Sequence, residues 1–396
     1  MSAWLTRSHR RVLLALFPLF VTATGVCKQA SPWPLWEKFA RHFIDPQGRV
    51  IDFSRDSITT SEGQSYAMFF AVVNNDRALF DHLLNWTQAN LAGGDLGKSL
   101  PGWKWGKAPD GQWKLLDAGP ASDSDCWIAY DLLEAGRLWN NKDYTALGKA
   151  MMTHIAQQEV ARLPGFGLML MPGLATHFTH GPIYILNPSY VPYFIFQRFA
   201  AVDPAGPWSG IAANIPRFLK QSDRGGFAMD WVSYTQANGF TPAPGPALPS
   251  PGQPPAPAVG SYDAIRVYLW AGMVDPTGTA RASLLAAVPG MAAYVPARGA
   301  PPEKVSDHGI PLPNDGPVGF SGAVLPYLQA LPQMDRAVQQ QLQRVKSQQD
   351  PVTGLFGQNP GFAGYYDQNL ILFGSGFQER KYGFGPNGEL KVEWAN

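Results

Sequence analysis

The sequence predicts an all-α fold in which helical hairpins close into a ring. From Trp33 onward the chain repeats one unit, an apolar-striped run of about 10–16 residues followed by a turn of Gly, Pro, Asn or Asp. Alternating apolar and polar residues, the pattern of a half-buried strand, are scarce and short. No heptad seam links the runs, so the pattern favours a ring of hairpins with short loop strands over a coiled-coil bundle.

The helical runs follow from the spacing of their apolar side chains. In residues 125–139 the stripe consists of Ile128, Leu132, Ala135 and Trp139. In residues 335–348 it consists of Val338, Leu342 and Val345. The other runs, in chain order, are 33–43, 62–74, 76–91, 143–163, 188–201, 264–273, 280–295, 320–331 and 362–373.

Residues 1–25 have the pattern of a secretory signal peptide. Three arginines precede an apolar run over residues 12–23, which is shorter than the roughly 20 residues that a membrane-spanning helix needs. Small residues follow the run. We therefore expect export to the periplasm and a mature domain over residues 26–396 that is not embedded in the membrane.

The composition narrows the classes of ligand. Lys and Arg total 31 against 30 Asp and Glu, and only 15% of residues are charged while 12% are aromatic. Such a neutral, aromatic-rich chain is neither a disordered protein nor a nucleic-acid binder, and an uncharged ligand suits it. Cys27 and Cys126 are the two cysteines, which excludes a disulfide framework and leaves a single bridge open. Because Val26 stands before Cys27 where a lipoprotein has a small residue, a lipid anchor is disfavoured.

One segment lacks the sequence pattern of a helix. Residues 241–260 hold eight prolines and no charged residue, which predicts an extended stretch. Because helical runs resume directly after it, we interpret it as a surface insertion within one domain and not as a linker between two. His177 and His180 have the spacing of metal ligands, but no third ligand is near in sequence, so we expect a surface loop and no metal site.

Three carboxylates are expected near helix N-termini. Glu62 follows Thr60 and Ser61, either of which can cap a helix; Asp123 lies just before the 125–139 run, whose expected cap is Asp125. Asp263 begins a further helix and shares a face with Arg266, three residues on. Taken singly, these are ordinary caps and ion pairs. A ring of hairpins, however, brings helix starts to one rim.

Aromatic residues accompany these carboxylates. Tyr66 and Tyr262 lie next to them in sequence, Tyr190 follows a turn, and Trp103 and Trp105 occupy an expected loop with the sequence PGWKWGK. Most of the 49 aromatic residues must form the core, but pyranose rings stack on flat side chains, and two separated carboxyls can act as acid and base. The combination favours a site for a sugar polymer.

The same segments carry a family resemblance. ASDSDCWIAYDLLEAGRLW over residues 121–139 resembles the signature of glycoside hydrolase family 8, and TSEGQSYAMFFA and SYDAIRVYLW resemble the family's acid and base segments. PSYVPYF, GPVGFSGAVLPYL and the order of all segments agree, from about Trp33 to Trp394. Ser124 stands where the family usually has Ala or Gly, and the proline-rich insertion is longer than the family's.

The resemblance implies an (α/α)6 barrel and an inverting mechanism without metal or other cofactor. It implies Glu62 as general acid, Asp263 as general base and Asp123 as the carboxylate that holds the sugar at the cleavage point. It implies Tyr262 and Arg266 beside the base, and Trp105 and Tyr190 as aromatic subsites. From their places in the sequence we add Tyr66 and Trp103 as substrate-binding residues. A helix N-terminus alone would lower the pKa of Glu62, which is the wrong direction for a general acid. We therefore expect burial beside Tyr66 and the negative charge of Asp123 to raise the pKa of Glu62.

The resemblance also implies a substrate. It points to an endo-β-1,4-glucanase that cuts β-glucan during bacterial cellulose synthesis and export, loosely associated with the synthase machinery. Two alternatives stay open: the same chemistry on mixed-linkage glucan, xylan or chitosan, and a glucan-binding chaperone without catalysis. A cationic chitosan chain would need an acidic cleft, which the neutral composition does not suggest.

Overall fold

The computed structural model describes residue 1 and residues 30–247, 256–357 and 364–395. The expected signal peptide and Cys27 lie outside these residues, as do the middle of the proline-rich segment and the expected start of the last helix at Phe362. Cys126 is buried and unbridged. No helix in the described part of the chain is long and apolar enough to cross a membrane.

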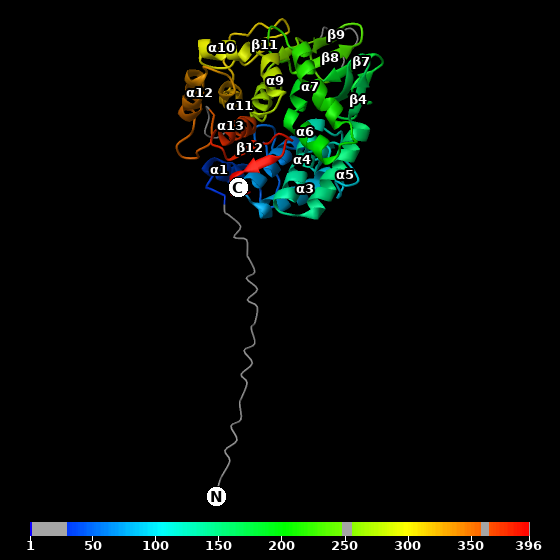
Figure 1. Cartoon of the computed structure of the whole chain (residues 1–396), viewed down its shortest axis with the longest axis vertical. Coiled ribbons are helices and arrows are strands. Elements are labelled where there is room, and N and C mark those ends of the chain that lie inside the picture. Colours follow the sequence, from blue (N-terminus) through cyan, green and yellow to red (C-terminus); the bar gives the residue numbers. More distant parts are fainter. Residues whose placement is uncertain (2–29, 248–255, 358–363, 396) are drawn as a thin grey trace.

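The described helices alternate between an inner and an outer layer of a ring (Figure 1). The inner helices are α2 (Ser61–Val73), α4 (Ser122–Leu138), α6 (Tyr193–Val202), α8 (Ile265–Met273), α11 (Val318–Gln329) and α13 (Tyr365–Gln378). The outer helices are α1 (Pro34–Phe43), α3 (Arg77–Leu91), α5 (Lys142–Gln158), α7 (Trp208–Ser222), α9 (Arg281–Ala287), α10 (Gly290–Arg298) and α12 (Asp335–Ser347). With α9 and α10 sharing one outer position, six hairpins form the predicted all-α (α/α)6 barrel.

Burial separates the two layers. Every residue of α8 is buried, as an inner helix with neighbours on all sides requires. In α12 the buried residues are Ala337, Val338, Gln341 and Val345, which form one stripe, whereas Arg336, Gln339 and Gln343 are exposed. The sequence pattern of residues 335–348 therefore marks an outer helix.

Aromatic side chains of the inner helices pack against one another at the centre of the ring. Phe373 on α13 packs against Phe69 of α2 at 5.4 Å between ring centroids and against Trp270 of α8 at 5.2 Å. Phe194 of α6 packs against Trp127 of α4 at 5.8 Å and against Trp270 at 6.3 Å. Helices far apart in sequence thus share one apolar core, which holds their N-terminal ends in fixed relation.

Short antiparallel strands fill the loops. β1 (Thr59–Thr60), β2 (Lys104–Lys107) and β3 (Trp113–Asp117) form one sheet, and β6 (Thr179–His180), β7 (Ile183–Leu186), β8 (Trp231–Thr235) and β9 (Gly239–Ala243) form another. The remaining pairs are β4 (Val160–Leu163) with β5 (Gly167–Leu170), β10 (Val259–Gly260) with β11 (Val305–Ser306), and β12 (Tyr382–Phe384) with β13 (Leu390–Val392). Two 3₁₀-helices, η1 (Pro188–Tyr190) and η2 (Glu393–Ala395), complete the described elements.

Several predicted boundaries are wrong, mostly where prolines or strands intervene. The run 143–163 ends at Gln158 and continues as β4, and the run 188–201 is divided into η1 and α6 at Pro192. Proline 289 likewise separates α9 from α10 within the run 280–295. The sequence analysis missed α7, which contains Pro216, because proline removes a helical hydrogen bond and usually ends a helix.

Two further corrections concern the site. The segment PGWKWGK is not a loop throughout, because residues 104–107 form strand β2. The helix predicted from residue 125 begins at Ser122 with Ala121 at its N-cap, so Asp125 is a buried residue of the first turn and not a cap. The proline-rich segment begins inside β9 and ends in β10.

Candidate active site

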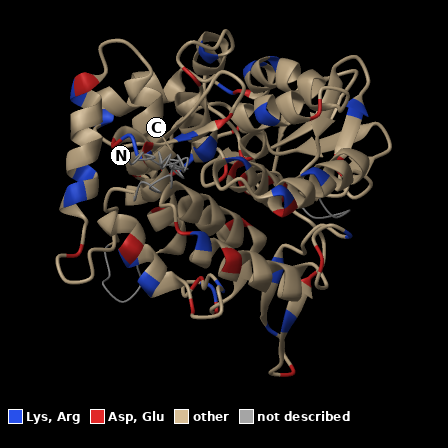
Figure 2. Ribbon diagram, turned by 60° about the horizontal axis from the view of Figure 1, so that its bottom comes forward, with Lys and Arg blue, Asp and Glu red and all other residues tan. Residues whose placement is uncertain are grey.

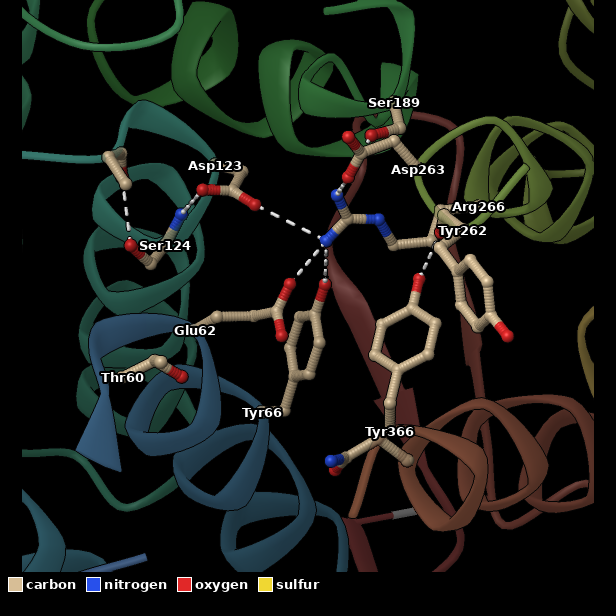
Figure 3. Close-up of polar contacts among 12 residues, drawn as sticks. Thr60, Glu62, Tyr66, Asp123, Ser124, Ser189, Tyr262, Asp263, Arg266 and Tyr366 are labelled. Atoms are coloured by element: carbon tan, nitrogen blue, oxygen red, sulfur yellow. Dashed lines mark hydrogen bonds and ion pairs between the residues drawn. The ribbon is translucent and has the colours of Figure 1, made fainter. Parts of the chain in front are cut away.

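Arg266 is the centre of a polar cluster at the helix N-termini (Figure 3). Its Nη2 donates to Asp263 Oδ1 at 2.7 Å, and its Nη1 donates to Asp123 Oδ2 at 3.3 Å and to Glu62 Oε2. The arginine side chain is 3% exposed, whereas those of Glu62 and Asp263 are 24% and 29% exposed. One buried cation therefore gathers all three predicted carboxylates, and the two expected as acid and base are the more accessible ones.

The start of α2 positions Glu62. Thr60 is the N-cap, since its side chain accepts a hydrogen bond from the backbone N–H of Gly63. A β-carbon at Gly63 would lie 2.6 Å from the hydroxyl of Tyr365, so this turn needs glycine. Pairing of β1 with β2 places the segment that carries Trp103 beside the start of α2. There the backbone N–H of Ser61 donates to the Trp103 carbonyl.

The start of α4 positions Asp123. Its Oδ1 accepts from the backbone N–H of Ser124 at 2.8 Å, which leaves Oδ2 directed at Arg266. The hydroxyl of Ser124 lies 2.6 Å from that of Ser61 and joins the starts of α4 and α2. The residue at which the sequence departs from the family pattern thus has a partner of its own within the site.

The remaining predicted residues have different positions. Tyr66 is buried and its hydroxyl accepts from Arg266 at 3.1 Å, so it supports the arginine from below. The guanidinium carbon of Arg266 lies over the ring of Tyr190, 5.6 Å from the ring centroid. Tyr262 is 46% exposed beside Asp263. Trp105 is turned away from the carboxylates and stacks on the exposed Trp113 with centroids 5.1 Å apart.

Two hollows open onto the carboxylates. The larger, of about 300 Å³, is lined by Asp52, Ser54, Arg55, Thr60, Glu62, Tyr262, Asp263, Tyr365 and Tyr366. The smaller, of about 130 Å³, is lined by Arg55, Thr60, Ser61, Glu62, Trp103, Ala121, Asp123, Tyr190, Asp263 and Arg266. Because Glu62 and Asp263 line both, a chain running through the two hollows passes the pair. Asp123 and Trp103 contribute to the smaller hollow, whereas Trp105 lines neither.

Several residues of this site could not be predicted from the sequence. Ser189 accepts from Arg266 Nη2 at 3.0 Å, Tyr366 donates to the carbonyl of Tyr262, and Tyr365 and Arg55 line the hollows. The segment PSYVPYF had drawn attention to the region of Ser189, but the others carry no local motif.

Burial raises the pKa of Glu62 to about 7. The positive charge of Arg266 opposes this shift, and the negative charges of Asp123 and Asp263 add to it. The expected direction is confirmed: loss of water around the carboxyl outweighs both the helix N-terminus and the arginine. A carboxyl with this pKa can donate a proton near neutral pH.

Metal ligands do not cluster in the described part of the chain, where no group of three or more His, Cys, Asp or Glu residues would hold an ion. His180 lies in β6 and His177 in the turn before it, away from the carboxylates.

Comparison with known proteins identifies the family of this chain. The family model for Glycosyl hydrolases family 8 matches residues 11–380. An endoglucanase of Xanthomonas axonopodis pv. citri (strain 306) is 45% identical over 383 residues, 96% of this chain and 94% of that protein. An endoglucanase of Escherichia coli (strain K12) is 41% identical over 377 residues, 95% of each.

A solved structure resembles the whole ring. The endo-1,4-D-glucanase from Vibrio fischeri ES114 superposes with a TM-score of 0.82 at 37% identity, covering 92% of this chain and 100% of that chain. The family model, the full-length relatives and the barrel thus point to the same family. The chain belongs to family 8 of the glycosyl hydrolases.

Proposed function

We propose that this chain is an inverting endo-β-1,4-glucanase in which Glu62 is the general acid and Asp263 the general base. The observation that carries the proposal is the pair of accessible carboxyls on the two arms of one buried guanidinium, bordering the same two hollows. Relatives named endoglucanase at 41–45% identity over nearly the full chain support the activity.

The two carboxyl groups take different parts in the reaction. Glu62, whose pKa is raised to about 7, protonates the leaving glycosidic oxygen. Asp263 removes a proton from the attacking water on the opposite face of the sugar ring. The water oxygen bonds to the anomeric carbon as the glycosidic bond breaks. Inverting enzymes keep the two carboxyls roughly 6.5–9.5 Å apart so that the water fits between sugar and base.

The other predicted residues bind and orient the glucan chain. Asp123 holds the sugar at the cleavage point and Arg266 holds the three carboxylates in register. Tyr66 supports Arg266. Trp103, Tyr190 and Tyr262 line the hollows, where their rings provide stacking faces for pyranose units. For Trp105 we propose a more distant sugar contact, formed by its stack with Trp113.

The biological setting is also part of the proposal. The basic and apolar pattern of residues 1–25 supports export to the periplasm, where the enzyme would cut newly made β-1,4-glucan during cellulose synthesis and export. A loose association with the synthase machinery belongs to this setting. Lys and Arg lie intermixed with Asp and Glu around the ribbon, which suits a neutral polymer better than a cationic one (Figure 2).

Reducing-sugar release from carboxymethylcellulose by the mature chain tests the proposal. We expect Glu62→Gln and Asp263→Asn each to lower the rate by about 10²–10⁴-fold, the range that general acid–base catalysis contributes. Circular dichroism should show both variants folded. ¹H NMR of cellohexaose cleavage should show the α-anomer as the first product.

Other outcomes point to the alternatives. Binding of cellohexaose without any release of sugar by the wild type would favour a glucan-binding chaperone. Neither binding nor cleavage would favour another polymer, to be sought among xylan, mixed-linkage glucan and chitosan. Full activity in either carboxyl variant would contradict the assigned roles.

A further inference from the structure

Asp230, a residue that no sequence motif marks, contacts the turn that carries Asp263. It lies directly before β8, and its Oδ1 accepts the backbone N–H of Ser261 at 2.7 Å and that of Ala264 at 2.8 Å. These two N–H groups stand on either side of the pair Tyr262–Asp263. One carboxyl oxygen therefore holds the two ends of the four-residue segment in which Asp263 lies.

Other contacts tie the same two segments together. The backbone N–H of Asp230 donates to the Val259 carbonyl at 2.9 Å. Ala228 N–H donates to the hydroxyl of Tyr268, on α8, at 3.0 Å. A β-carbon at Gly260 would lie 2.0 Å from the Ala228 carbonyl oxygen, so the two backbones approach as closely as glycine allows. Residues 228–230 thus brace both the turn before α8 and the helix itself.

We propose that Asp230 is a positioning residue for the general base, an inference that rests on the proposed function of Asp263. Asp230 acts through the main chain: it fixes the backbone of residues 261–264, and Arg266 then orients the Asp263 side chain that this backbone carries. Misplacing a reacting group by about 1 Å costs of order 10²-fold in rate, so a brace of this kind affects catalysis more than binding.

The protonation of Asp230 fits this role. Burial raises its pKa to about 7, the charge of Asp263 adds to the shift, and the backbone N–H bonds oppose it. Both N–H bonds end on Oδ1, so this oxygen serves as acceptor whether the carboxyl is ionised or protonated. An asparagine amide oxygen provides the same acceptor without charge. An alanine provides none, and it leaves the N–H groups of Ser261 and Ala264 without their partner.

The test compares Asp230→Ala with Asp230→Asn on a soluble cello-oligosaccharide. We expect Asp230→Ala to lower kcat by about 10- to 100-fold with a smaller change in KM, because Tyr262 is the one proposed stacking residue that lies in the segment held by Asp230. Asp230→Asn should retain most of the wild-type kcat. Asp76→Ala is the matched control, since the Asp76 carboxylate also accepts a backbone N–H, from Leu79 at the start of α3, away from the site; its kcat should not change.

Three results would overturn the inference. They are an unchanged kcat in Asp230→Ala, equal losses in the Asn and Ala variants, or a rise in KM that accounts for the whole loss. Thermal unfolding of each variant shows whether a lower rate reflects a lower kcat of folded enzyme or a smaller fraction of folded enzyme. If Asp263→Asn proves active, the proposed function fails instead, whatever the Asp230 variants do.

Discussion

A single residue, Arg266, governs the charge balance of the site. Its guanidinium contacts Glu62, Asp123 and Asp263, and its positive charge lowers the pKa of the buried Glu62, against burial and against the two aspartates. The pKa of Glu62 nevertheless stays raised, at about 7. A general acid must be protonated to act, so kcat/KM is expected to fall as the pH rises through about 7.

Asp123 is expected to tune this acid. Because its negative charge raises the pKa of Glu62, Asp123→Asn should move the alkaline limb of the kcat/KM profile to lower pH, in addition to any loss of rate. The measurement is the pH dependence of cellohexaose cleavage. Asp131→Asn, which replaces another buried carboxyl of α4, is the control and should leave the limb in place. An alkaline limb that does not move in Asp123→Asn would show that Asp123 only holds the sugar.

At the scale of elements, α4 and α5 meet at a buried pair of carboxyls. Asp125 in the first turn of α4 and Glu159 at the C-cap of α5 are both fully buried and interact with each other, and no other described residue donates a hydrogen bond to their carboxyl oxygens. Burial raises the pKa of Glu159 to about 8, and burial with Glu159 nearby raises that of Asp125. The junction beneath Asp123 is therefore stable only while protons remain on this pair.

The pair makes folding stability depend on pH. The pKa of Glu159 is about 8 in the folded state against an ordinary 4.5, so its favourable contribution is complete below pH 4.5 and is lost as the pH rises to about 8. Glu159→Gln removes that loss, and we expect its free energy of unfolding to exceed that of the wild type progressively from pH 5 to pH 8. Urea unfolding at several pH values measures the difference. Parallel curves for the two proteins would contradict the prediction.

At the scale of the whole molecule, the ring depends on close contact between inner helices. Gly272 of α8 faces the backbone of α11, where an added β-carbon would lie 2.2 Å from the carbonyl carbon of Pro326. Neither backbone can move without shifting the helix starts that carry the site. The barrel and the active site are thus one packing unit, in which a change at the core of the ring reaches the carboxylates at its rim.

We therefore expect Gly272→Ala to destabilise the fold by about 1–3 kcal/mol, the usual cost of overpacking a core. Gly210→Ala in the outer helix α7 is the control. Its added β-carbon would meet Leu168 at 3.5 Å, an ordinary contact, and alanine favours a helix by roughly 1 kcal/mol over glycine. Denaturant unfolding should show opposite signs for the two variants. A stable Gly272→Ala would mean that α8 and α11 tolerate separation.

The sequence by itself determined most of the helices and the acidic residues near three of their starts. Helical periodicity depends on neighbours three and four residues apart, so the runs over α1, α2, α3, α8 and α12 could be predicted closely. The family resemblance added the (α/α)6 form of the ring and the expected roles of Glu62, Asp123 and Asp263. Their convergence, inferred from a ring of hairpins, is confirmed by the contacts of Arg266 with all three.

Only the tertiary structure decided which partners these residues have. Ser189 is 77 residues from Arg266, and Asp230 is 31 and 34 residues from the N–H groups it accepts. The burial of Asp125 against Glu159 instead of at a helix cap likewise depends on how α4 and α5 pack. Contacts of this length follow from the path of the chain through the ring, and no local spacing encodes them. Local periodicity therefore places Glu62 and Asp263 near helix starts, whereas packing decides which partners hold them.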